Sequence, residues 1–136
     1  MTHTLYGSFV EAVKNDSEVA RLQELSAVMT RMPVANREML KVLIRHLNKV
    51  AAKHEINLMT AANLGVVFGP TLLRPREETV ASIMDIKFCN EVVEILIDNC
   101  DTFFPAHEQS DSSPEISLGG SRKHKCKLEV LHYFSC

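Results

Sequence analysis

Apolar side chains recur at helical spacing over residues 33–53, and this stripe constrains the fold more than any other feature of the chain. The positions follow i, i+3, i+4, i+7, i+10 and i+11, which places them on one face of an α-helix. They are Leu40, Leu43, Ile44, Leu47, Val50 and Ala51. Pro33 can open this helix, because the first helical position needs no backbone N–H. Arginine and lysine side chains occupy the other faces, as expected where a helix meets water.

Further helical patterns lie on both sides of this stripe. We predict helices over 5–14, 17–31, 61–68 and 83–103. Thr60 is the expected N-cap of the third of these, and Gly69-Pro70 is expected to end it. The last helix is expected to bury six apolar residues: Ile86, Val92, Val93, Leu96, Ile97 and Phe103. No segment alternates with period two, so the predicted fold class is all-α, a helical bundle without a sheet.

The composition divides the chain into two parts. Residues 1–104 carry the helical patterns and form the predicted folded domain. Residues 105–136 are polar and rich in serine and glycine at first, which is typical of a disordered tail. A basic patch at 122–127 and a short apolar end follow. The basic patch could make weak contact with anionic lipid, although a solvated end is the simpler interpretation.

Charge and hydropathy exclude several classes of function. The chain has 15 Lys and Arg against 17 Asp and Glu, a net charge of −2, which argues against nucleic acid as the partner. No run reaches the roughly 20 apolar residues of a membrane span, and no signal peptide is recognisable. The four cysteines form no CxxC pair. We therefore expect a cytoplasmic protein with reduced thiols.

Catalytic and metal-binding patterns are scarce. Glu77 and Glu78 are adjacent acids, best explained by a loop or a helix start. His46 and His54 lie eight residues apart, too far for a metal pair on one helix turn, and are expected on the surface. His124 with Cys126 would need further ligands from elsewhere. We predict no catalytic residue, no metal and no cofactor.

The informative stretch is 57–75. On a helix starting near Thr60, the residues Met59, Asn63 and Val66 share one face, with one amide between apolar side chains. Gly65 within this helix costs about 1 kcal/mol relative to alanine, which indicates a close approach by another group. The simpler interpretation is that Gly65 admits a neighbouring helix and Asn63 ties down a loop. The alternative is a protein-docking face with a central polar group.

The segment 63–73, Asn-Leu-Gly-Val-Val-Phe-Gly-Pro-Thr-Leu-Leu, resembles the signature of Rho GTPase-activating (RhoGAP) domains. Residues 32–47 resemble the preceding helix of that family, and 74–88 are similar to its oligophrenin/GRAF-like subgroup. The resemblance covers about residues 5–104, with several blocks in the right order.

The resemblance implies an all-helical domain that docks on the nucleotide-switch regions of Rho-family small GTPases of the Rho, Rac or Cdc42 type. Such domains accelerate GTP hydrolysis by inserting an arginine finger. The GTPase supplies the nucleotide site and magnesium, so the domain is a regulator and not itself a hydrolase. By the same resemblance, Asn63 contacts the GTPase and helps hold the finger loop. Met59, Val66 and Pro70 line the docking groove, and Arg74 follows it.

The finger loop of this family has the pattern G-x-[FY]-R-x-[SP]-G and lies upstream of these motifs. No such pattern occurs in the 136 residues, so the chain resembles the C-terminal two-thirds of a RhoGAP domain. Because the finger is worth about 10³ to 10⁵ in rate, we expect this chain alone to be a weak or inactive activator. The alternatives are a GTPase-binding module that competes with activators, or a fragment without function.

Overall fold

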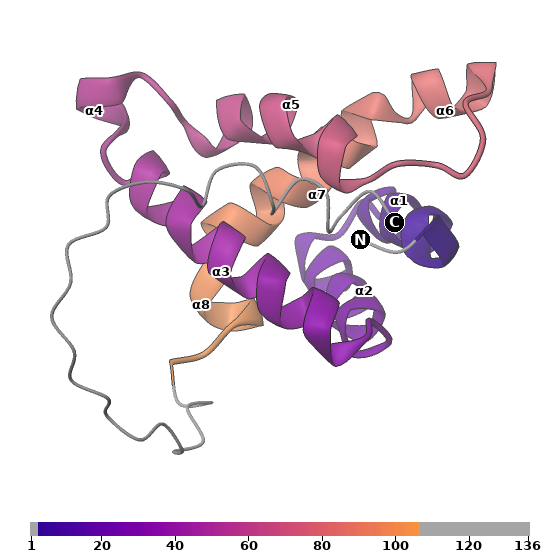
Figure 1. Cartoon of the computed structure of the whole chain (residues 1–136), viewed down its shortest axis with the longest axis horizontal. Coiled ribbons are helices and arrows are strands. Elements are labelled where there is room, and N and C mark those ends of the chain that lie inside the picture. Colours follow the sequence, from indigo (N-terminus) through magenta and orange to yellow (C-terminus); the bar gives the residue numbers. More distant parts are fainter. Residues whose placement is uncertain (1–2, 107–136) are drawn as a thin grey trace, which may run out of the picture.

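The computed structural model describes residues 3–106, which form helices joined by short connections (Figure 1). No strand occurs within this range, and the all-α fold predicted from the sequence is confirmed. The elements in chain order are η1 (His3–Leu5), α1 (Tyr6–Val13), α2 (Glu18–Thr30), α3 (Val34–Ala51), α4 (His54–Asn57), α5 (Ala61–Leu72), α6 (Val80–Met84), α7 (Ile86–Asp98) and α8 (Cys100–Phe103). The predicted tail and its basic patch at 122–127 lie outside the described residues.

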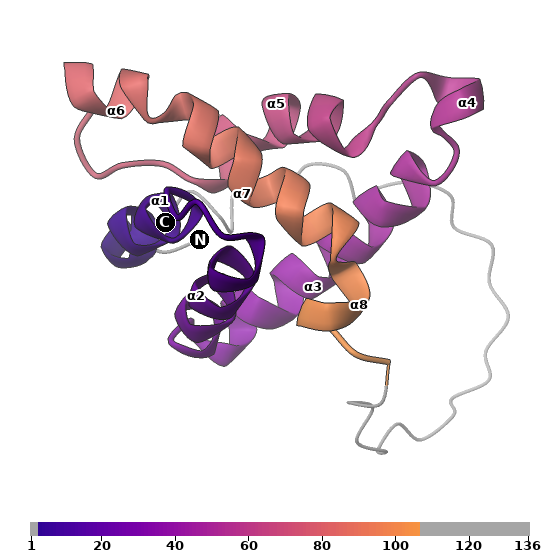
Figure 2. The same cartoon turned by 180° about the vertical axis from the view of Figure 1, so that it is seen from behind.

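Helix α7 is the centre of the fold, because α1, α3 and α5 each pack against it (Figure 2). Its inward residues are fully buried: Val92, Val93, Leu96 and Ile97. The predicted stripe of α3 supplies Leu40, Ile44 and Leu47 to the same core. The helices therefore share one hydrophobic cluster, which extends from Leu5 to Phe104.

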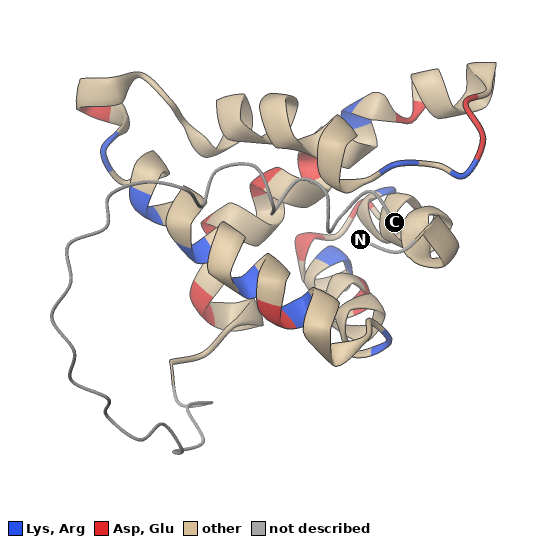
Figure 3. Ribbon diagram, viewed as in Figure 1, with Lys and Arg blue, Asp and Glu red and all other residues tan. Residues whose placement is uncertain are grey.

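Polar side chains of α3 fasten the C-terminal helices. Asn48 Nδ2 donates to the Ile97 carbonyl at 2.9 Å, at the last turn of α7. Arg45 Nη2 donates to the carbonyl of Phe104 at 2.9 Å, just after α8. These bonds satisfy carbonyl groups that a helix end leaves without an intrahelical partner. Figure 3 marks the charged residues along the length of α3, where Lys41 pairs with the exposed Glu38 at 3.6 Å.

Two predicted helix limits are wrong. The helix predicted to end at Phe68 continues through Gly69 and Pro70 to Leu72, because the next turn is held by the buried Leu72 and by a bond from Leu73 N to Gly69 O at 2.9 Å. Proline removes only one helical hydrogen bond here, and it does so near the helix end.

The single helix predicted over 83–103 is three helices, α6, α7 and α8. Thr79 and Ser82 form a capping box that starts α6 separately, and Asp85 lies at the junction with α7. Asn99 leaves the helical conformation and ends α7 before α8 begins. Ile86, predicted to be buried, is exposed because it begins α7 at this junction, and Phe103 is only half-buried.

Candidate functional site

Helix α5 begins at the residue that the sequence predicts. The Thr60 side chain accepts a hydrogen bond from Asn63 N at 3.2 Å, which satisfies one of the free N–H groups of the first turn. No residue of α5 is charged, and its ribbon is uniformly tan in Figure 3. The helix is apolar on both faces, which is typical of a helix covered on all sides.

The inner face of α5 packs mainly against α7. Gly65 and Gly69 are buried against Asn90, where a Cβ on Gly65 would lie 2.6 Å from the Asn90 carbonyl oxygen. A Cβ on Gly69 would lie 2.8 Å from the Asn90 backbone nitrogen. Two glycines one turn apart thus let the two helix backbones approach closely. The interpretation that Gly65 admits a neighbouring helix is confirmed.

The outer face of α5 remains exposed to solvent. It carries Asn63, Val66, Val67 and Pro70, and the Val66 side chain is 60% exposed. The sequence pattern singled out Asn63 and Val66, the family resemblance added Pro70, and neither indicated Val67. A search for helix positions opposite Gly65 and Gly69 would have found it, because glycines that meet another helix mark the buried side.

Asn63 fastens the loop before the helix, as the simpler interpretation of this residue expected. Its Nδ2 donates to the Leu58 carbonyl at 3.1 Å, while the residue itself is exposed. Met59 differs from the other site residues, because it precedes the N-cap and is half-buried against the core. It therefore does not share the exposed outer face with Asn63 and Val66.

Pro70 and Arg74 lie at the other end of this face and line a hollow of about 280 Å³ beside α6. His3 Nδ1 donates to the Arg74 carbonyl at 3.0 Å, which ties the loop after α5 to the N-terminal helix turn. Arg74 itself is exposed to solvent. The structure thus brings Asn63, Val66, Pro70 and Arg74 along one side of the molecule.

The Cys89 thiol and the Tyr6 hydroxyl in this hollow are not activated for catalysis. Cys89 Sγ donates to the Tyr6 hydroxyl at 3.8 Å, and burial raises the pKa of both groups above their ordinary values. The thiol therefore stays protonated near neutral pH, and a thiol is a much weaker nucleophile than a thiolate. This hollow offers contact surface and no activated nucleophile.

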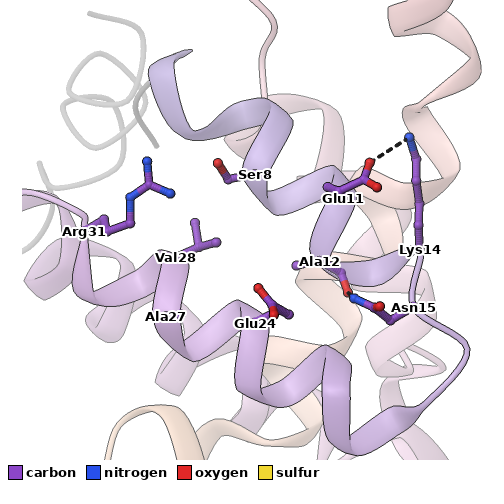
Figure 4. Close-up of a pocket in the computed structure, with 9 residues that line it drawn as sticks. All are labelled: Ser8, Glu11, Ala12, Lys14, Asn15, Glu24, Ala27, Val28 and Arg31. Carbon is purple, nitrogen blue, oxygen red and sulfur yellow. Dashed lines mark hydrogen bonds and ion pairs between the residues drawn. The ribbon is translucent and has the colours of Figure 1, made fainter.

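A larger hollow between α1 and α2 contains none of the predicted site residues (Figure 4). Its floor is apolar, with Ala12 and Val28, and its rim carries charges of both signs. Glu11 and Lys14 on that rim pair at 3.4 Å. The rim has two acidic and two basic residues, so its charge indicates no particular ligand.

Neither a metal nor a membrane site is found in the described part of the chain. Residues 3–106 contain no group of three or more His, Cys, Asp or Glu that could hold a metal ion. The helices of this range are too short or too polar to cross a bilayer. His46 and His54 are exposed, as expected.

With an all-helical domain and an uncharged, exposed helix face in place, comparison with known proteins defines the class. Residues 1–77 match the model of the RhoGAP domain family, and this range includes all five predicted site residues. The chain therefore belongs to the RhoGAP domain family, and the resemblance predicted from the sequence is confirmed.

The relatives are of the GRAF kind. Rho GTPase-activating protein 26 of Xenopus laevis is 52% identical over 128 residues, which are 92% of this chain and 17% of that protein. Rho GTPase-activating protein 42 of Danio rerio is 46% identical over 134 residues, 92% of this chain and 16% of that protein. The chain thus spans about one sixth of the length of these relatives.

Two solved structures have the same fold. The BH domain of GRAF, the GTPase regulator associated with focal adhesion kinase, superposes with a TM-score of 0.71 at 52% identity, covering 76% of this chain and 55% of that one. Human Rho GTPase activating protein 15 superposes with a TM-score of 0.69 at 35% identity, covering 74% of this chain and 48% of that one.

Proposed function

We propose that this chain is a Rho-family GTPase-binding module and that the outer face of α5 docks on the switch regions of the GTPase. The observation that supports this most is the division of α5 into two apolar faces. Gly65 and Gly69 commit one face to α7, while Val66, Val67 and Pro70 leave the other exposed in water. Exposed apolar side chains gathered on one helix face are typical of a protein-binding site.

The site residues take separate roles in this proposal. Val66 and Pro70 provide apolar contact area, and Asn63 presents the polar group within it. Arg74, at the end of the face, approaches acidic groups of the GTPase. Met59 is half-buried against the core and supports the loop before α5 from the core side. The chain works without a cofactor of its own, in the cytoplasm, where Cys89 and Cys100 stay as free thiols.

Binding can be tested by calorimetry or pull-down with Rho, Rac and Cdc42 loaded with GDP or a non-hydrolysable GTP analogue. We expect preference for the GTP state. Val66→Asp should weaken binding at least tenfold, because it buries a charge in the contact. Val42→Asp is the matched control, since Val42 is a 67% exposed valine on α3, away from this face, and should leave binding unchanged. Equal effects of the two variants would rule out the α5 face.

We further propose that the chain binds without strong activation, as a competitor of complete activators. The supporting observation is that no arginine of residues 1–136 stands in the finger pattern. A single-turnover hydrolysis assay should give a rate at least about 10³-fold below that of a domain with its finger. Comparable stimulation would show that another arginine, Arg74 among them, replaces the finger.

A further inference from the structure

The loop between α4 and α5 holds an apolar residue in an unfavourable conformation. Leu58 has φ 59° and ψ 16°, and it is the only residue other than glycine with a positive φ within 3–106. Left-handed backbone brings Cβ too close to the following carbonyl oxygen, and leucine has no side-chain group that compensates. The Leu58 side chain is also 75% exposed, and Ile56 beside it is 86% exposed. Residues 56–59, which join the last residues of α4 to the loop before α5, are called the 56–59 tip.

Two asparagine side chains hold the tip in this shape. Asn57 Nδ2 donates to the Val50 carbonyl of α3 at 2.8 Å, and Asn57 Oδ1 accepts from Met59 N at 2.8 Å. Asn63 Nδ2 donates to the Leu58 carbonyl at 3.1 Å. The left-handed residue is therefore fastened on both sides, to α3 and to α5. Its conformation is fixed before any partner arrives.

The core does not explain this arrangement. Leu58 and Ile56 contribute nothing to the hydrophobic cluster, so their apolar surface is unfavourable in water. Backbone strain persists where surrounding contacts determine it, and it concentrates at binding sites. Asn63 belongs both to the outer face of α5 and to the support of the tip. The tip is thus continuous with the proposed docking face.

The chemistry of this continuous surface indicates the kind of partner. Residues 56–73 contain no charged side chain, while Glu55 and Arg74 flank them directly. The exposed residues of this segment therefore offer no charge to a partner, which favours an apolar patch over an acidic peptide or a phosphate backbone. The exposed face of α5 around Val66 is uncharged in the same way, so one partner surface can meet both the face and the tip.

We propose that Leu58 is a further contact residue for the GTPase and that Asn63 is a positioning residue that holds it. This proposal rests on the proposed function. Affinity for the GTPase and stability of the fold can be measured separately. A purely structural residue would change both together. Glycine adopts positive φ without strain, so Leu58→Gly removes the contact while relieving the backbone.

The test uses the full chain and GTP-analogue-loaded Rho, Rac and Cdc42. Leu58→Gly should weaken binding about tenfold, an effect equivalent to about 1.4 kcal/mol. Its midpoint of urea unfolding should stay unchanged or rise. Leu58→Met, which keeps the apolar side chain, should retain most of the affinity. Val42→Ala truncates a similarly exposed apolar residue on α3 and should change neither property.

Asn63 is tested by a double-mutant cycle, which measures coupling between neighbouring residues. Asn63→Ala should weaken binding in the wild-type background and have a smaller effect once Leu58 is glycine. Additive effects would overturn the positioning role of Asn63.

Each remaining outcome is decisive. If Leu58→Gly binds like wild type while Val66→Asp does not, the tip is not a contact and the docking face still stands. If Leu58→Gly loses affinity and unfolding midpoint together, Leu58 is structural and the proposal is wrong. If the wild-type chain binds no GTPase in either nucleotide state, the proposed function fails and this proposal fails with it.

Discussion

At Gly65 and Gly69, a side chain is missing because the backbone of Asn90 occupies the space that it would need. The two glycines have no unusual backbone angle, since both lie in an ordinary helix. Their role is the distance between α5 and α7. That distance in turn fixes which side of α5 faces solvent, so two residues of the inner face determine the position of Asn63 and Val66.

Gly65→Ala should therefore destabilise the chain, although alanine is the better helix former by about 1 kcal/mol. The new Cβ would lie 2.6 Å from a backbone oxygen, which cannot rotate away as a side chain can. Overpacking of this kind costs about 1–3 kcal/mol. After the helix-propensity gain is subtracted, we expect a net loss of up to about 2 kcal/mol in the free energy of unfolding, measured by urea titration with circular dichroism.

Gly7→Ala is the matched control, because nothing lies within 4 Å of the Cβ that it adds to α1. It should stabilise the chain by about 0.5–1 kcal/mol through helix propensity alone. The close approach of α5 to α7 would be refuted if both substitutions stabilised the chain.

The role of Gly65 could be predicted from the sequence, while that of Leu58 could not. A glycine within an otherwise regular helix carries a known cost, so its presence indicates a close neighbour. Leucine is common in every kind of element and carries no such signal. Its left-handed conformation ends α4, where Leu58 N donates to the His54 carbonyl at 2.8 Å. The hydrogen bonds of Asn57 and Asn63 that hold it become visible only when α3 and α5 are placed in space.

The helices themselves differ in how much they contribute to the fold. Helix α5 buries five residues and packs along α7 more extensively than any other pair of described helices. Helix α6 buries none and extends from the body of the domain (Figure 1). Both begin at a threonine whose hydroxyl accepts a backbone N–H three residues later. Loss of this hydrogen bond should therefore change the free energy of unfolding of the domain by different amounts in the two helices.

Thr60→Ala should lower the free energy of unfolding by about 1 kcal/mol, the usual cost of losing an N-cap. Thr79→Ala removes the equivalent bond from α6 and should leave the unfolding midpoint nearly unchanged, with faster amide hydrogen exchange confined to 80–84. Urea titration measures the first effect and hydrogen exchange the second. An equal loss of stability in the two variants would mean that α6 belongs to the cooperative core.

The sequence predicted that these helices exist better than it predicted where they end. The stripes over 33–53 and 17–31 follow from periodicity, because burial of one face selects apolar residues directly. Pro70 was expected to end α5, yet packing of the buried Leu72 extends the helix beyond it. Such an end depends on a tertiary contact, which has no local signature.

For the whole molecule, the apolar character of α5 was visible in the sequence, but its exposure was not. A helix that is apolar on every side is normally buried on every side. Here, one side packs on α7 and the other carries Val66 and Val67 into solvent. Membership of the RhoGAP domain family suggests the proposed partner of that exposed side. The uncharged segment 56–73 extends it to the loop before α5.

The C-terminal end of the described domain is packed and hydrogen-bonded, which leads to a prediction about residues 107–136. Within residues 3–106, the hydrophobic cluster runs from Leu5 to Phe104, and Arg45 satisfies the carbonyls of Phe104 and Pro105. We propose that residues 1–104 form the domain and that residues 105–136 are a tail that adds nothing to its stability. A chain that ends at Ala106 should unfold at the same urea midpoint as the full chain, within about 0.5 kcal/mol, the range of changes made away from the core. It should also bind GTP-analogue-loaded GTPase with unchanged affinity in calorimetry. A clear fall in midpoint would instead make the segment after Ala106 part of the folded unit, and a fall in affinity alone would place a GTPase contact within it.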